Sequence, residues 1–282
     1  MNFNNDILWI FSATNPEVIP SYVVGGIMPA DYLKIKKIIF LKSHDPKTFL
    51  LEFKPKLIVI NKAFHSNITL LAEEARDLDI KIISVFDDWH FGTPISNKVE
   101  QRFINNKILA NISNNIVVKT KKAAELIYQN IGLKANIISD CLRFKSHHPV
   151  KEIIYPFKVS WFGMYTNHDT LKYGIEEILE YDFNVNLKII TNKISNLQEK
   201  LNYFNLKNIN LELIEWNEKM DQEIIKTDIV IIPYINDHHR IVKSYNRILD
   251  SINLGRFTII SDLDHLRKFE DYCFIGNIGQ GL

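Results

Sequence analysis

The stretch TDIVIIPYINDHHRIVKSYNRILDSINLGRFTIISD, residues 227–262, reads as strand, polar loop, helix, glycine turn and strand. Residues 229–232 form a β-branched apolar run bounded by a proline, which predicts a strand covered on both faces. Ser244 is suited to cap a helix with apolar residues at helical spacing, and Gly255 is the residue type that follows such a helix. The apolar run 257–260 predicts the next strand. The stretch therefore predicts one β-α-β unit.

Basic side chains gather where this helix is expected to begin. The loop and the first helical turn contain Arg240, Lys243, Ser244 and Arg247. Unpaired backbone N–H groups and the positive end of the helix dipole favour a phosphate at such a place. Asp250, one or two turns further on, could accept hydrogen bonds from ribose hydroxyls. The alternative interpretation is a surface helix with ordinary charges.

The run Lys243-Ser244-Tyr245-Asn246-Arg247, followed by a glycine and a strand, resembles the donor-binding segment of GT-B glycosyltransferases. In that family the segment is a Lys-Ser-x-Asn-Arg or Glu-(x)7-Glu helix. Asp250 occupies the position of the second Glu, whereas Val242 occupies that of the first, so the match is to the Lys-Ser-x-Asn-Arg type. The donor-binding residues that the resemblance implies are Gly163, Arg240, Lys243, Ser244, Asn246, Arg247 and Asp250.

Length and composition indicate an ordinary globular protein of one large or two medium domains. The chain has 282 residues, of which 46% are hydrophobic and 24% charged. The net charge of +1 argues against a dedicated nucleic-acid binder, which should carry a basic excess. The two cysteines, Cys141 and Cys273, are far apart and match no metal-binding spacing.

Apolar runs and helical patterns alternate along both halves of the chain, which predicts parallel sheets built from right-handed β-α-β units. Residues 143–156 hold two prolines and little periodicity and are expected to link two domains, 1–145 and 146–282. The predicted fold class is α/β, with two Rossmann-like, doubly wound parallel-sheet domains facing a cleft. The resemblance implies the same organisation, with the acceptor on the first domain and the nucleotide-sugar on the second.

The best catalytic candidates in the first half are Asp87, Asp88 and His90, which follow the predicted strand 81–86. Ligands of open α/β sheets bind beyond the carboxyl ends of the strands. A carboxylate beside an imidazole at that place can act as general base for an acceptor hydroxyl. The alternative interpretation is a capped turn with its tryptophan packed on the domain.

Two further features of the first half fall beyond strand ends. Gly25-Gly26 would let a sugar approach the backbone, or would form a turn with positive φ. His65 would contact a phosphate or would merely be solvated.

No cofactor is expected, because the nucleotide-sugar is a substrate. No metal site is expected either. Asp87-Asp88 lacks the intervening residue of a metal-binding Asp-x-Asp, and Asp262-Leu263-Asp264 comes too late in the chain for the GT-A arrangement. No apolar run reaches the roughly 18 residues that span a bilayer. We expect a cytoplasmic protein. The basic residues Lys34, Lys36 and Lys37 make loose attachment to the inner face of the membrane a further hypothesis, and the alternative interpretation of this cluster is a solvated face.

The resemblance implies a metal-independent glycosyltransferase that moves a sugar from a nucleotide-sugar donor to a hydroxyl of a glycan or lipid-linked acceptor, in polysaccharide biosynthesis. Two alternatives remain open. One is a GT-B enzyme of the UDP-sugar 2-epimerase type, which would need no acceptor. The other is a non-catalytic module of a glycan-assembly complex, which would bind no nucleotide.

Overall fold

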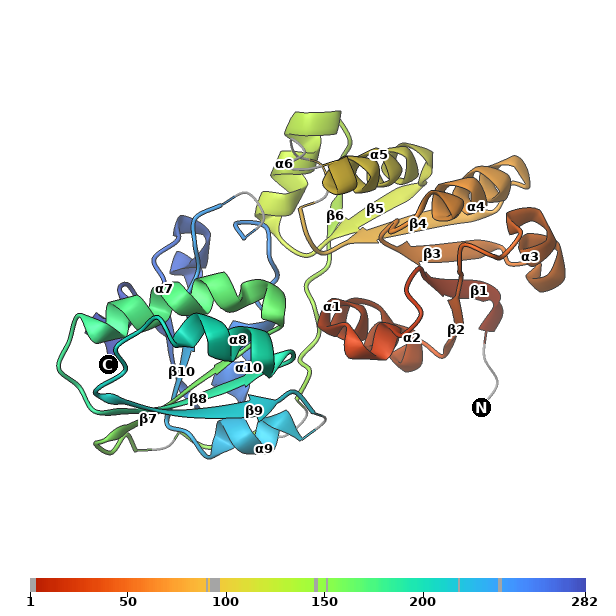
Figure 1. Ribbon diagram of the computed structural model, residues 1–282. Helices are drawn as coiled ribbons and strands as arrows, with labels where there is room; N and C mark the ends of the chain where they lie inside the picture. Colours follow the sequence, from red (N-terminus) through yellow and green to blue (C-terminus); the bar gives the residue numbers. More distant parts are fainter. Residues whose placement is uncertain are drawn as a thin grey trace. The chain divides into compact units, whose positions relative to one another are not determined.

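A computed structural model of the chain consists of two α/β units (Figure 1). The structure describes residues 4–89, 91, 97–144, 147–150, 152–217, 219–237 and 240–282. The first unit comprises Met1–Cys141 and His238–Ser244, and the second comprises Leu142–Asp237 and Tyr245–Leu282. The division falls between Cys141 and Leu142, a few residues before the boundary at 145 expected from the sequence. The segment just before the predicted donor helix groups with the first unit.

The first unit contains a six-stranded, all-parallel sheet with the strand order β2-β1-β3-β4-β5-β6. Its strands are β1 (Asn4–Phe11), β2 (Ile35–Ile39), β3 (Leu57–Asn61), β4 (Lys81–Phe86), β5 (Asn115–Val118) and β6 (Asn136–Ile137). The chain passes from β1 to β2 on one side and then from β3 onward on the other. The switch point of this sheet therefore lies at the carboxyl ends of β1 and β3, where ligands of such sheets bind.

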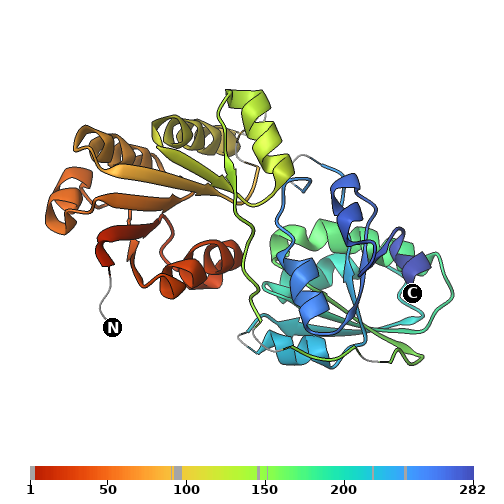
Figure 2. The ribbon, with the colours of Figure 1, turned by 180° about the vertical axis from the view of Figure 1, so that it is seen from behind.

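Helices cover both faces of the first sheet (Figures 1 and 2). One face packs against α3 (Pro46–Phe53), α4 (Ser66–Asp77), α5 (Asn97–Ile112) and α6 (Lys121–Ile131). The other face packs against a helical segment made of η1 (Pro16–Val18), α1 (Pro20–Tyr22), the wide turn η2 (Val23–Ile27) and α2 (Met28–Tyr32). This double cover explains why β1 and β3 are continuous apolar runs and not alternating ones.

The second unit also contains a six-stranded, all-parallel sheet, with the order β12-β11-β10-β7-β8-β9. Its strands are β7 (Phe157–Phe162), β8 (Val185–Thr191), β9 (Ile209–Glu215), β10 (Ile229–Ile232), β11 (Phe257–Ile260) and β12 (Phe274–Ile275). This is the strand order of a dinucleotide-binding Rossmann fold. Its switch point lies at the carboxyl ends of β7 and β10.

Two hydrophobic layers sandwich the second sheet. One contains α7 (His168–Leu179), α8 (Ile194–Leu201) and α11 (Ile278–Gly281). The other contains α9 (Met220–Ile225), α10 (Asn246–Asn253) and η4 (Asp264–Phe269). The short helix η3 (Tyr165–Asn167) directly precedes α7. The two layers meet opposite faces of β7 and β10, so the sheet is buried on both sides, as the run Ile229–Ile232 predicts.

The sequence predictions of the regular elements are confirmed with shifts of a few residues at their ends. Asp45 caps α3 by accepting a hydrogen bond of 2.8 Å from the Thr48 amide. Gly255 follows α10 with a φ of 66°, as the glycine after a helix should. Two predictions were wrong. Ser244 is not the cap of α10, which begins at Asn246 after Tyr245, and Gly25-Gly26 is helical and not a turn with positive φ.

Among the residues that the structure describes, no helix is both long and apolar enough to cross a membrane.

Candidate functional site

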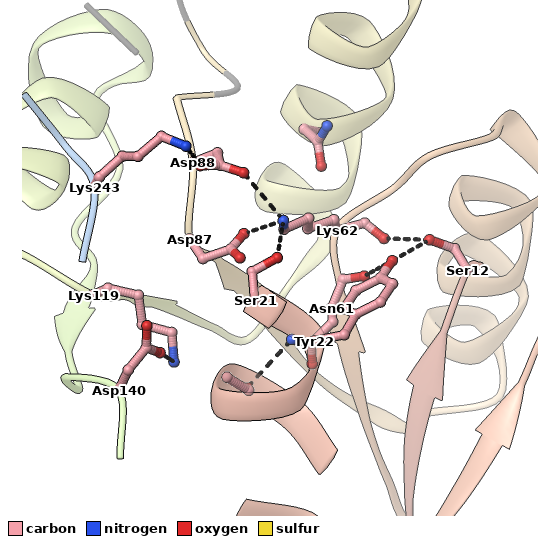
Figure 3. Close-up of polar contacts among 12 residues, drawn as sticks. Ser12, Ser21, Tyr22, Asn61, Lys62, Asp87, Asp88, Lys119, Asp140 and Lys243 are labelled. Carbon is pink, nitrogen blue, oxygen red and sulfur yellow. Dashed lines mark hydrogen bonds and ion pairs between the residues drawn. The ribbon is translucent and has the colours of Figure 1, made fainter. Parts of the chain in front are cut away.

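Lys62 is the centre of a buried polar cluster at the carboxyl edge of the first sheet (Figure 3). It directly follows β3 and has a φ of 57°, a left-handed conformation that is uncommon for a residue with a side chain. Its Nζ lies 2.6 Å from Asp87 Oδ1 and 3.3 Å from Asp88 Oδ2, and it donates a 3.0 Å hydrogen bond to Ser21 Oγ. Non-glycine residues in sparsely populated backbone regions concentrate at functional sites.

Opposite charges keep the Lys62 ammonium ionised. Burial alone would lower the pKa of Lys62, but the nearby charges of Asp87 and Asp88 raise it by more, so the pKa lies above its ordinary value. Asp87 is itself buried, whereas the side chain of Asp88 is 35% exposed. Asp88 is therefore the carboxylate of this pair that a solute can reach.

A hydrogen-bonded chain holds the backbone around Lys62. Ser12 Oγ lies 2.9 Å from the Tyr22 hydroxyl and donates to the Lys62 carbonyl at 3.2 Å, and Tyr22 donates to the Asn61 carbonyl at 3.2 Å. Burial raises the pKa of Tyr22 to about 12, so the phenol stays protonated and can donate. Asn61 Oδ1 accepts a hydrogen bond from the Trp9 indole. These contacts fix the strand ends at the switch point.

A second buried ion pair joins the carboxyl end of β5 to the chain after β6. Lys119 Nζ lies 3.0 Å from Asp140 Oδ1, and both side chains are buried. Burial raises the pKa of Asp140, while the Lys119 charge and a hydrogen bond with Ser244 oppose the shift. Gly25 leaves the space for this pair, because a Cβ on it would lie 3.3 Å from Lys119 Cε.

The segment that precedes α10 adds a third lysine to this edge. Lys243 Nζ lies 3.6 Å from Asp88 Oδ1. Thr120 donates a 3.0 Å hydrogen bond to the Val242 carbonyl, and Val242 is buried in the core of the first unit. Three lysines and three aspartates therefore form ion pairs at the carboxyl edge of the first sheet: Lys62, Lys119, Lys243, Asp87, Asp88 and Asp140.

Several sequence interpretations of the first half are corrected by this arrangement. Gly25 and Gly26 do not line a sugar site, because their missing side chains make room for the chain itself. A Cβ on Gly26 would lie 2.7 Å from the Phe11 ring. His65 is not solvated: it is buried, with Nε2 3.2 Å from the Phe40 carbonyl oxygen, and burial lowers its pKa. His90 lies outside the described residues.

Arg247 lies at the switch point of the second sheet. It is in the first turn of α10 and donates from Nη1 to the carbonyl of Phe162, the last residue of β7, at 3.4 Å. The guanidinium also lies over the ring of Tyr234, 5.3 Å from its centroid, just beyond β10. Gly163 is adjacent, since a Cβ on it would be 3.5 Å from Nη1 and 3.0 Å from the Trp161 ring. The structure thus brings the predicted residues Gly163 and Arg247 together.

The other predicted donor-binding residues are divided between the two units. Asn246 is the first residue of α10, and its Oδ1 accepts from the Arg247 amide at 2.8 Å. Arg240, Lys243 and Ser244 group with the first unit. Their assignment to the donor stays a prediction.

Asp250 is buried in the second unit. Its Oδ1 accepts a 2.9 Å hydrogen bond from the Arg143 amide, so it anchors the chain that leads into this unit. The Arg143 guanidinium in turn lies 5.0 Å from the centroid of the Trp216 ring, beyond β9. Trp216 is partly buried against the core of the unit. The predicted role of Asp250 in binding the ribose stays a prediction.

Sequence reasoning missed Lys62, Lys119 and Asp140. The signal that identified Asp87 was a charged residue directly after a buried apolar run, and the same signal is present in LIVIN-Lys62 and NIVV-Lys119. Across the described part of the chain, no group of three or more His, Cys, Asp or Glu residues is arranged to hold a metal ion.

Comparisons with known proteins identify the fold. No family model matches the sequence, and no curated protein matches it significantly. The structure is similar to HepE from Anabaena in complex with UDP and glucose, with a TM-score of 0.70 and 11% identity over 98% of this chain and 87% of that chain. It is also similar to sucrose-phosphate synthase from Thermosynechococcus elongatus, with a TM-score of 0.67 and 11% identity over 95% and 85% of the two chains.

A UDP-GlcNAc 2-epimerase from Neisseria meningitidis, bound to UDP-GlcNAc, matches with a TM-score of 0.53 and 14% identity over 98% of this chain and 88% of that chain. Both sheets of this chain, each covered by helices on two faces, correspond to the two Rossmann-like domains of these structures. The chain therefore has the GT-B glycosyltransferase fold.

Proposed function

We propose that this protein is a glycosyltransferase that takes a sugar from a nucleotide-sugar donor and transfers it to an acceptor hydroxyl without a metal ion. The observation that carries the proposal is Arg247 beside Gly163 at the switch point of the second sheet. Ligands of doubly wound sheets bind at such points, and a guanidinium there suits a diphosphate. The neighbours solved with UDP and glucose or with UDP-GlcNAc support this choice of ligand.

In this proposal the charge of Arg247 stabilises the leaving nucleoside diphosphate. Negative charge develops on the diphosphate as the glycosidic bond breaks, and a fixed cation near that position lowers the barrier. Asp88 is the proposed base for the acceptor hydroxyl, because its side chain is 35% exposed whereas that of Asp87 is buried. Asp87 and His90 stay predicted alternatives for the same base. The proposed acceptor is a glycan or a lipid-linked acceptor, and the proposed place of action is the cytoplasm.

The test is binding of UDP, GDP, CMP and dTDP, alone and as their sugar conjugates, measured by thermal shift and then by titration calorimetry. We expect one nucleotide diphosphate to bind and Arg247→Ala to weaken it at least tenfold, because charged hydrogen bonds contribute about 1.5–3 kcal/mol. Arg267→Ala is the matched control, since Arg267 is an exposed arginine of the same unit paired with Asp262. If no nucleotide binds, both enzyme hypotheses fail and only the hypothesis of a non-catalytic module of a glycan-assembly complex is left.

The similarity to the UDP-GlcNAc 2-epimerase gives the second candidate function. An epimerase would act on the donor alone, whereas a transferase needs an acceptor or releases the sugar by slow hydrolysis. Incubation of the bound nucleotide-sugar without acceptor, followed by chromatography of the product, distinguishes the two. A new epimer of the intact nucleotide-sugar would replace the transferase proposal by the epimerase.

A further inference from the structure

The amino edge of the first sheet carries an exposed apolar tip. Tyr32 ends α2 and is 87% exposed, and Leu33, which follows it, is 56% exposed. Both directly precede β2, and α2 packs against that strand (Figure 1). This edge is the opposite one from the cluster around Lys62, which lies at the carboxyl ends of the strands. The tip therefore takes no part in the proposed donor or base chemistry.

Three lysines lie at the same amino edge of the first sheet as this tip. Lys34 follows Leu33, and Lys54 follows α3; both have left-handed backbones, with φ of 54° and 45°, and both are exposed. Lys36 extends over the ring of Phe53, 4.4 Å from its centroid, which connects the start of β2 to the end of α3. Within the described residues, no acidic side chain forms an ion pair with these three lysines. We call Tyr32, Leu33, Lys34, Lys36 and Lys54 the amino-edge patch.

The sequence segment that contains this patch is basic, although two of its lysines, Lys42 after β2 and Lys47 at the start of α3, lie at the other edge of the sheet. Between Asp31 and Lys56 there are seven lysines and three acidic residues, an excess of four positive charges in a chain whose net charge is +1. The remainder of the chain is therefore acidic by three charges. The excess is entirely lysine, with no arginine in the segment. Nucleic-acid surfaces usually combine arginine with lysine, whereas lysine next to exposed aromatic and aliphatic side chains suits an anionic lipid surface.

We propose that the amino-edge patch docks the protein on an anionic lipid bilayer. Tyr32 would lie at the headgroup level, where amphipathic aromatic rings are stable, with Leu33 beside it. The three lysines would lie above the headgroups and interact with their negative charges. The inference goes beyond the proposed function, since it concerns where the protein is held and depends on none of the donor-binding residues.

The experiment is co-flotation of the full chain with vesicles of phosphatidylcholine alone and of phosphatidylcholine with phosphatidylglycerol. We expect binding to the anionic vesicles that falls steeply between 50 mM and 500 mM NaCl. The Lys34→Glu/Lys54→Glu variant should bind at least tenfold more weakly, because each lysine near an anionic surface strengthens binding about fivefold. The Tyr32→Ser/Leu33→Ser variant should lose roughly tenfold, through its lost apolar contact.

Tyr203→Ser is the control for the apolar tip, because Tyr203 is 90% exposed on the second unit, and it should bind normally. All substituted residues are exposed, so thermal melting should be unchanged and the loss of binding is not loss of fold. Equal binding to neutral vesicles, undiminished binding of either double variant, or stronger retention on an equally charged nucleic acid than on the vesicles would each overturn the proposal. Nucleotide binding measured on the same samples keeps this outcome separate from the donor-site proposal.

Discussion

Lys62 Nζ lies 2.6 Å from Asp87 Oδ1, although the two residues follow different strands of the first sheet. Both side chains are buried, so the Asp87 charge depends on Lys62 for compensation, while Lys62 is also paired with Asp88. Asp87 is thereby committed to an ion pair inside the unit, and Asp88 is the acidic residue left partly open to solvent. The pair that the sequence identifies as one acidic cluster thus consists of a buried and an accessible carboxylate.

Removal of the Lys62 charge should destabilise the first unit strongly. Lys62→Met leaves the buried Asp87 carboxylate without its cation, and such half-broken pairs typically cost about 3–5 kcal/mol of the free energy of unfolding. Urea unfolding followed by circular dichroism measures the loss. Lys62→Met/Asp87→Leu removes both charges and should recover much of it. A single variant as stable as the wild type would show that the pair is not buried in solution.

Two glycines with positive φ should respond differently to alanine. Gly132 has a φ of 73° and open space around it, so Gly132→Ala should cost only the left-handed strain of about 1 kcal/mol. Gly255 has a φ of 66°, and a Cβ there would lie 2.2 Å from the Pro149 carbonyl oxygen. Gly255→Ala should therefore cost clearly more, because backbone must move. Equal melting temperatures of the two variants would contradict the packing of residues 148 and 149 against this turn.

The strand pattern could be predicted from the sequence because both sheets are buried on two faces, so their strands are continuous apolar runs such as Ile229–Ile232. Residues 16–32 were not predicted to be helical, since they contain three prolines and two adjacent glycines. In the structure these prolines occupy first turns of helical segments, where a proline needs no N–H partner. Proline, which ends a helix when it lies in the interior, thus lies here at the beginning of short helical segments.

The candidate site could be predicted only in part, for a different reason. Local sequence shows that Asp87 follows a strand, but its partner is decided by strand order. Lys62 is 25 positions earlier in the chain and becomes a neighbour because β3 and β4 pair in parallel. The division of the predicted donor residues between two units is equally a property of the whole chain path, and no local pattern around Lys243 encodes it.

Acid should destabilise the second unit through His168. This imidazole is buried, with Nε2 2.9 Å from Thr191 Oγ1, and burial lowers its pKa to about 4. In the unfolded chain the pKa is near 6.5, so protonation favours unfolding: stability is complete above pH 6.5 and falls as the pH decreases toward 4. Denaturant melts at pH 7.0 and 5.0 should show this loss, and His168→Gln should reduce it. An identical pH dependence in the variant would remove His168 as the cause.

Lys243 should matter more for transfer than for stability. Among the described residues, Lys243 forms an ion pair with Asp88, at 3.6 Å between two partly exposed side chains, and such pairs contribute about 0–1 kcal/mol to folding. If Lys243 neutralises the donor diphosphate, Lys243→Ala should abolish transfer while the melting temperature changes little. The assay uses the nucleotide-sugar identified by the binding screen, and Lys226→Ala is the control, since Lys226 is an exposed lysine paired with Glu223. Near-normal turnover of Lys243→Ala, beside a clear loss in Arg247→Ala, would confine the phosphate site to the residues of the second unit.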